Sequence, residues 1–122
     1  MKDKSRRRIA DRAEDILLAI TNIRGDVGDM GKTAFLADGK TQRAVIESLI
    51  VIGEAATHII HAAPDLEIRQ HDAWRHLQDA SGMRNILTHE YFQVDASVVW
   101  DTVTNDLASL ENSLQVVGDV GD

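Results

Sequence analysis

The chain has 122 residues and a formal net charge of −7, with 20 acidic side chains against 13 Lys and Arg. This charge argues against a general nucleic-acid binder, which needs a basic surface, but it is compatible with a nuclease that has a small basic site. Because no cysteine is present, disulfides, thiolate zinc sites and thiol nucleophiles are excluded.

The length predicts one helical domain over residues 1–122, in which residues 115–122 form a short acidic tail that we expect to fray. No apolar run approaches the roughly 20 residues of a membrane span. Charged residues interrupt everything that follows Arg6 to Arg8, so no secretory signal is expected. We therefore expect a cytoplasmic protein without a membrane segment.

The hydrophobic periodicity is helical almost throughout the chain. Ser5 is a suitable N-cap for a first helix. The apolar stripe of this helix would be Ile9, Ala13, Ile16, Leu17, Ile20 and Ile23.

A glycine-containing loop follows the first helix and ends in Gly31-Lys32-Thr33, which superficially suggests a phosphate-binding loop. We reject that interpretation because Asp26 stands where the first glycine is required and no buried strand precedes it. Phe35 and Leu36 are expected to anchor the connection to the core.

The second helix is predicted from Thr41 to Ala63, before the single proline, with an apolar stripe of Val45, Leu49, Ile52, Ala56 and Ile59. Gly53 would allow another helix to approach closely. Glu54 lies inside this apolar run, and by itself it is compatible with an ordinary surface residue. Glu54, His58 and His61 share one face, but no second Glu-x-x-His helix completes a metal site, so no metal or cofactor is expected.

The third helix is predicted to begin at His71 or Asp72, with Asp72 as its N-cap. Trp74 and Leu77 should face the core, whereas His71 and His76 should be exposed.

A fourth helix, capped by Asp95 or Ser97, would carry a long apolar stripe of Val99, Trp100, Val103, Leu107, Leu110 and Leu114. The fold class is therefore all-α, an up-down four-helix bundle with a longer first connection.

The stretch Met83 to Phe92, M-R-N-I-L-T-H-E-Y-F, organises the functional prediction. On a helical projection one arc is polar, and it holds Arg84, Asn85, Thr88 and His89. The opposite side is apolar, with Met83, Ile86 and Leu87, while Tyr91 returns almost directly above Arg84.

An arginine in such an arc suits phosphate, because its fork of donors fits phosphate oxygens, and a histidine can exchange protons near neutral pH. The alternative is a solvated helix face without a task. Because both Arg84 and His89 lie on the polar arc, we expect either to be replaceable by alanine without unfolding the chain.

The run R-N-I-L-T-H-E-Y resembles the Arg, four residues, His, any residue, Tyr signature of the HEPN ribonucleases, and of the HepT toxins in particular. I-G-E-A at Ile52 to Ala55, Trp74-Arg75, the run from His89 to Asp95 and Val99-Trp100 resemble further blocks of that family. The similarity covers roughly Ile9 to Leu114.

The resemblance implies a HEPN-type bundle that cleaves RNA, either transfer RNA or messenger RNA, without a metal. Arg84 would bind the scissile phosphate, and His89 would act as general base or general acid. Asn85 would hold the imidazole or bind phosphate, with Thr88 in support. Glu54, in the I-G-E-A block, would orient an arginine or support a subunit contact. Each chain has one motif histidine, and Arg84 and His89 diverge by about 140° on an ideal helix, so we expect a homodimer with a composite cleft.

The resemblance further implies the toxin of a type VII toxin–antitoxin system, paired with a minimal nucleotidyltransferase (MNT) antitoxin. This antitoxin would adenylylate Tyr91 and so block RNA binding beside Arg84. The charge of −7 favours a different class, a non-catalytic helical adaptor that presents substrate to a nucleotidyltransferase.

Overall fold

A computed structural model describes residues 2–120, and it describes side chains from Ile9 to Gln115 and that of Val117. The long helices are α1 (Lys2–Val27), α3 (Gly39–Ala62) and α5 (His71–His89), followed by α6 (Ala96–Asn105) and α7 (Leu107–Val120). The connections contain α2 (Lys32–Leu36), α4 (Leu66–Arg69) and a 3₁₀ turn, η1 (Tyr91–Gln93). All regular structure in residues 2–120 is helical, which confirms the all-α class.

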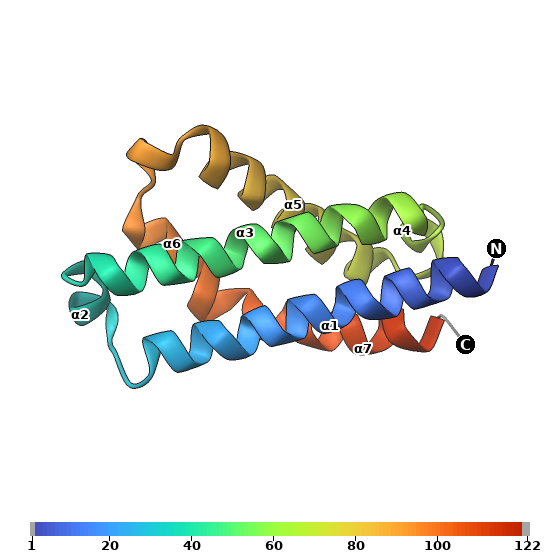
Figure 1. Cartoon of the computed structure of the whole chain (residues 1–122), viewed down its shortest axis with the longest axis horizontal. Coiled ribbons are helices and arrows are strands. Elements are labelled where there is room, and N and C mark those ends of the chain that lie inside the picture. The colour runs from blue at the N-terminus through green and yellow to red at the C-terminus, as the bar shows by residue number, and fades with distance from the viewer. Residues whose placement is uncertain (1, 121–122) are drawn as a thin grey trace.

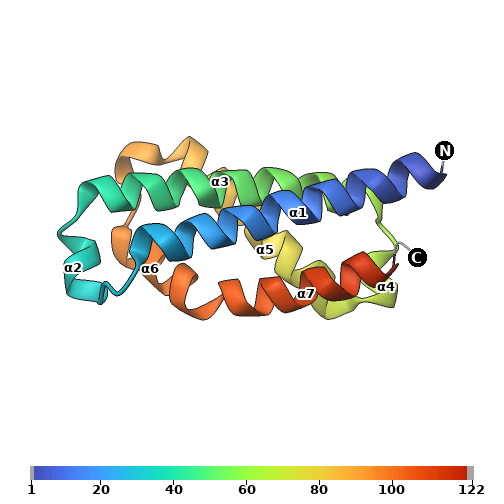
Figure 2. The ribbon, with the colours of Figure 1, turned by 60° about the horizontal axis from the view of Figure 1, so that its bottom comes forward.

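The helices form a bundle in which α3 packs against both α1 and α5, and α7 closes it against α1 and α5 (Figures 1 and 2). α2 lies at one end of the bundle, and α4 lies at the other. The C-terminal half of α5, in yellow to orange, rises away from α3 before the chain returns to α6 (Figure 1). The polar arc predicted from the motif lies on this departing half.

The predicted apolar stripes form the core. Every predicted member on the second helix is buried, as are most members on the first, namely Ala13, Ile16, Ile20 and Ile23. α3 has a mean hydropathy of 1.4 in its most apolar window, enough by length and composition to cross a membrane, which the sequence-based expectation did not foresee. Its buried positions nevertheless pack against α1 and α5, which is the arrangement of a central core helix.

The ends of the helices differ from prediction in several places. α1 begins at Lys2, so Ser5 lies inside the helix, and the side chains of Arg6 to Arg8 lie outside the described part. α3 begins at Gly39 because the Asp38 carboxylate accepts the Thr41 N–H at 3.1 Å, a hydrogen bond that lowers the Asp38 pKa. α5 begins at His71 as predicted, but Gln70 is its N-cap and Asp72 lies in its first turn.

The predicted fourth helix is two helices, α6 and α7, joined at Asp106. Asp95 caps α6 by accepting the Ser97 N–H at 2.8 Å, as one of the two predicted alternatives required. The Thr102 and Thr104 hydroxyls donate to carbonyl oxygens one turn earlier, at 2.9 and 3.0 Å, and such bonds often bend helices. The bend directs α6 towards α2 and α3, while α7 lies on α1 and α5.

The C-terminal segment is helical to Val120, although we expected fraying from residue 115. The physical reason is burial, because Leu114 and Val117 continue the apolar stripe into the core. Residues 121 and 122 lie outside the described part. α7 is also tied to α1 by a bidentate ion pair between Arg24 and Glu111, which lowers the Glu111 pKa.

Aromatic contacts fix the two connections that flank the bundle. Phe35 is fully buried, and its ring centroid lies 5.2 Å from that of Trp100. Leu36 is exposed, so the predicted anchoring to the core is confirmed for Phe35 and wrong for Leu36. Trp74 is half-buried against the core and stacks on His71 at 5.8 Å.

α3 and α5 approach each other closely at Gly53. A Cβ placed on Gly53 would overlap the Arg84 Cβ, and it would lie 2.9 Å from the Arg84 Cγ and 2.8 Å from the Ala80 carbonyl oxygen. Because a side-chain root and a backbone oxygen cannot move aside easily, only glycine fits there. The predicted role of Gly53 is confirmed.

Gly53→Ala should therefore force α3 and α5 apart and lower the free energy of unfolding by about 1–3 kcal/mol, the usual cost of overpacking. Urea denaturation followed by circular dichroism measures this. Gly25→Ala is the matched control, since a Cβ there meets nothing within 4 Å in a helix, and it should be neutral or stabilising by up to about 1 kcal/mol. Equal effects of the two substitutions would contradict the close-approach argument.

Candidate functional site

Arg84 is held on α5 by two neighbours at the Gly53 crossing. Its Nη2 forms an ion pair with Glu54 Oε1 of α3, and its Nη1 donates to Asn85 Oδ1 at 3.0 Å. The Arg84 side chain is 34% exposed and that of Glu54 is 47% exposed, so the pair lies at the edge of the core. Glu54 thus contacts an arginine, which is one of the roles expected for it.

The Arg84 guanidinium is anchored at its base and partly open at its tip. Its Nε is buried and has no hydrogen-bond partner among the described residues, while both terminal nitrogens are oriented by side chains. A planar guanidinium with two of its nitrogens fixed presents its remaining donors in a defined direction. This pre-orientation is useful for binding an oxyanion, because less side-chain freedom is lost on binding.

The remaining polar residues of the motif lie on the outer face of α5, as predicted. Asn85, Thr88 and His89 are all exposed. The Thr88 hydroxyl donates to the Arg84 carbonyl oxygen at 3.0 Å, so its proton is committed to its own helix. Thr88 can therefore offer a ligand an acceptor oxygen but not this donor.

The opposite side of the motif is only partly buried. Leu87 is fully buried and Met83 is half-buried, but Ile86 is 52% exposed. The difference follows from the path of α5, because its last turns leave the bundle, so that Leu87 is buried and Met83 packs on the edge of the core whereas Ile86 does not reach it. The apolar side of the motif is thus buried at Leu87 and largely exposed at Ile86.

Tyr91 does not lie on the helix that carries Arg84. α5 ends at His89, Glu90 leaves the helical conformation with φ −120° and ψ 31°, and Tyr91 begins η1. The helical projection that placed Tyr91 above Arg84 therefore does not apply beyond His89, and that prediction is wrong. Tyr91 is 45% exposed, so its side chain is accessible where the chain turns away.

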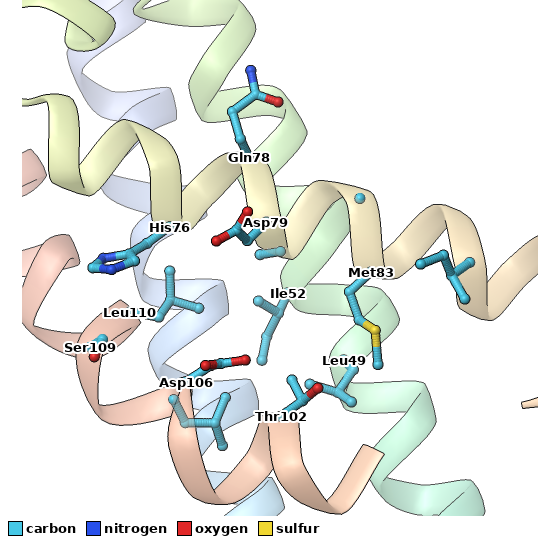
Figure 3. A pocket seen from close by; sticks show the side chains of 14 residues that line it. Leu49, Ile52, His76, Gln78, Asp79, Met83, Thr102, Asp106, Ser109 and Leu110 are labelled. Atoms are coloured by element: carbon cyan, nitrogen blue, oxygen red, sulfur yellow. The ribbon is translucent and has the colours of Figure 1, made fainter. Parts of the chain in front are cut away.

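A cleft of about 410 Å³ lies between α5 and the α6–α7 bend, with Leu49 and Ile52 of α3 at its floor (Figure 3). Asp79 and Asp106 lie on its walls, and Met83 and Ile86 line its α5 side. The cleft is thus bordered by the apolar side of the motif rather than by the polar arc. No residue of the sequence-based site lines it.

His76, at the edge of this cleft, corrects another expectation. It is half-buried rather than exposed, and its Nδ1 lies 2.7 Å from the buried Ser113 Oγ of α7. The hydrogen bond joins α5 to α7 and gives His76 a structural role. No partner of His76 was predicted from the sequence. Ser113 is buried beside Leu114 on α7, but one sequence does not show which residue a buried serine contacts.

The arrangement provides a fixed cation and an exposed imidazole on one helix, without bringing them to one point. Arg84 and His89 are five residues apart and diverge by about 140° on a regular helix. Glu54 is turned to Arg84, and no cluster of three His, Cys, Asp or Glu side chains forms in the described part of the chain. One chain therefore supplies a single imidazole and a single guanidinium from the motif.

Residues 16–117 match the family described as "Ribonuclease HepT-like". The chain is 39% identical over 107 residues to "Probable ribonuclease HepT" of Thermococcus cleftensis, which spans 86% of this chain and 91% of that protein. A protein of Methanocaldococcus jannaschii is 37% identical over 93 residues (75% of this chain and 71% of its own). One from Caldanaerobacter subterraneus subsp. tengcongensis is 30% identical over 83 residues (68% and 70%).

The relatives from M. jannaschii and C. subterraneus are both named as candidate RNases. No solved structure matches the chain.

The packing predicts that Arg84 and His89 contribute differently to the stability of the fold. Arg84→Ala removes the stem that covers Gly53 and the partner of Glu54, so it should lower the free energy of unfolding by about 1–2 kcal/mol. His89→Ala, at an exposed helix end, should change it by less than about 0.5 kcal/mol. The sequence-based expectation that both substitutions leave the fold unaffected is thus retained for His89 alone.

Urea denaturation of the two variants beside Arg84→Met tests this difference. Methionine keeps an unbranched stem over Gly53, so it should restore part of the loss. If Arg84→Ala proves as stable as His89→Ala, the stem of Arg84 does not contribute to the packing of α3 on α5.

Proposed function

Because the chain belongs to the HepT-like ribonuclease family, we propose that it is an RNA-cleaving enzyme whose site is built from Arg84 and His89 of two protomers. The observation that carries the proposal is the Arg84 guanidinium, fixed by Glu54 and Asn85 and partly open at its tip, five residues before the exposed His89 on the same helix. An anchored cation beside an exposed imidazole suits a phosphodiester without the help of a metal.

In the proposed reaction the 2′-hydroxyl of a ribose attacks the adjacent phosphorus. His89 of one protomer takes the 2′-hydroxyl proton, while His89 of the partner subunit gives a proton to the departing 5′-oxygen. The P–O5′ bond breaks as the O2′–P bond forms, so the products are a 2′,3′-cyclic phosphate and a 5′-hydroxyl. Arg84 stabilises the charge that builds on the phosphate oxygens.

A homodimer supports this reaction for two reasons. Acid and base are both needed, and each protomer supplies one motif histidine. The chain is also acidic, with a net charge of −7, so two Arg84 side chains in one cleft provide a local basic site that one chain lacks. An isologous interface along the outer face of α5 would bring both pairs together.

We further propose that the enzyme acts in the cytoplasm as the toxin of a toxin–antitoxin pair. Its partner would be a nucleotidyltransferase that adenylylates Tyr91. The Tyr91 ring is 45% exposed and follows His89 by two residues, so added AMP would place negative charge and bulk close to the proposed cleft. This would exclude RNA while the antitoxin is active.

Mixed dimers test the composite site. When wild-type and His89→Ala chains are mixed equally and exchanged, about one quarter of the dimers are wild-type, and RNA cleavage in EDTA should fall to that fraction. A fall to one half would show that each protomer cleaves alone. No cleavage by the wild-type dimer would instead support the adaptor function that the acidic charge favours.

Tyr91→Phe tests the proposed silencing. Because phenylalanine keeps the ring but cannot accept AMP, this variant should cleave RNA at the wild-type rate and stay active after incubation with the nucleotidyltransferase and ATP. The measurement is cleavage activity beside a mass shift of one AMP on the wild-type chain. A Tyr91→Phe variant that is silenced equally would mean that binding, and not modification, inhibits the enzyme.

A further inference from the structure

Phe92 is 98% exposed, more than any other large apolar side chain described in the structure. Burying a phenylalanine normally stabilises a protein, so a ring left in water forgoes a large contribution. Phe92 lies three residues beyond His89, which places it at the proposed site rather than on a remote surface. Its exposure therefore points to a ligand at that site.

The ring is presented by an ordered segment. Phe92 is the middle residue of η1, where the Gln93 N–H donates to the Glu90 carbonyl oxygen at 2.8 Å. The Asp95 cap of α6 closes the same short connection. The Tyr91 and Phe92 rings meet edge to face, with centroids 5.5 Å apart, and the rest of Phe92 remains open.

The surroundings of Phe92 favour a flat aromatic ligand over a protein surface. Glu90, Gln93 and Asp95 are all exposed, so the apolar surface here is limited to the adjoining rings of Tyr91 and Phe92. The next exposed aliphatic residues, Ile86 and Val98, are each six residues away in the sequence, and Ile86 lines the cleft beside α5. A protein interface of ordinary size needs a larger apolar centre than two adjoining rings.

We propose that Phe92 is a stacking platform for an unpaired RNA base next to the phosphate bound by Arg84, an inference that rests on the proposed ribonuclease function. Bases stack on aromatic rings irrespective of their identity, and only unpaired bases can be turned out to do so. The substrate would thus be single-stranded RNA with little base preference. A neutral base also tolerates the neighbouring Glu90 carboxylate, whereas a phosphate would not.

The first test is RNA binding and cleavage by Phe92→Ala, Phe92→Leu and Phe92→Trp. Phe92→Ala should lower kcat/KM on a single-stranded oligonucleotide about 5–100-fold, and leucine, which has bulk but no π-face, should not restore it. Tryptophan should restore it. Ile68→Ala, which removes another highly exposed apolar side chain (87%) on α4, is the matched control and should be unchanged.

A double-mutant cycle with abasic RNA identifies the stacked base. We place one abasic position on either side of the cleavage site. At the stacked position, the missing base should lower kcat/KM of the wild-type enzyme as much as Phe92→Ala lowers kcat/KM on intact RNA. The variant should lose nothing further on the same abasic RNA. Additive losses would overturn the stacking proposal.

Two further outcomes would also overturn it. Leucine restoring full activity would mean that Phe92 is covered by protein, and a monomer on sedimentation of Phe92→Ala would identify that protein as the second copy.

A non-cleavable RNA distinguishes a failure of the ribonuclease proposal from a failure of the stacking proposal. It carries a 2′-deoxyribose at the cleavage site and 2-aminopurine beside it. Stacking predicts that the wild-type chain quenches the fluorophore and Phe92→Ala does not, whether or not normal RNA is cleaved. Equal quenching by both chains would overturn the platform while leaving the ribonuclease intact.

Discussion

The contact of Arg84 with Gly53 is the constraint on which the rest of the site depends. α3 and α5 cross where one residue has no side chain, and the stem of Arg84 occupies the space that a Cβ would fill. The same crossing brings Glu54 to the guanidinium. The packing of α5 on α3 therefore also fixes the position of the charge, since α5 cannot shift on α3 without moving the Arg84 guanidinium.

This coupling explains how an acidic chain can keep a cationic site. The guanidinium is paired with one carboxylate and one carboxamide, which fix its orientation without burying it completely. Beyond the crossing, α5 departs from the bundle, so His89, Tyr91 and Phe92 gather on a projecting end. The motif is thus divided into Arg84, which is placed by packing against α3, and an exposed end that begins at Thr88.

The sequence predicts those features that depend on periodicity and fails on those that depend on how segments meet. The stripes of α1 and α3, the Asp95 cap and the need for glycine at position 53 follow from spacing and backbone chemistry. The bend at Asp106 and the end of α5 at His89 do not, because threonine back-bonding and the turn at Glu90 have no periodic signal. The exposure of Phe92 was not predicted either, since an aromatic side chain is normally expected to be at least partly buried.

The termini have a practical consequence. The first residues of α1 and the last residues of α7 lie together at the α4 end of the bundle, whereas α5 runs from there towards the far end, where η1 lies (Figures 1 and 2). An affinity tag, a fluorescent reporter or a surface tether fused at either end of the chain would thus be held apart from the C-terminal end of α5. Immobilised protein should remain accessible to long RNA molecules, and a pair of reporters on both termini would sit too close together to sense events at the tip of α5.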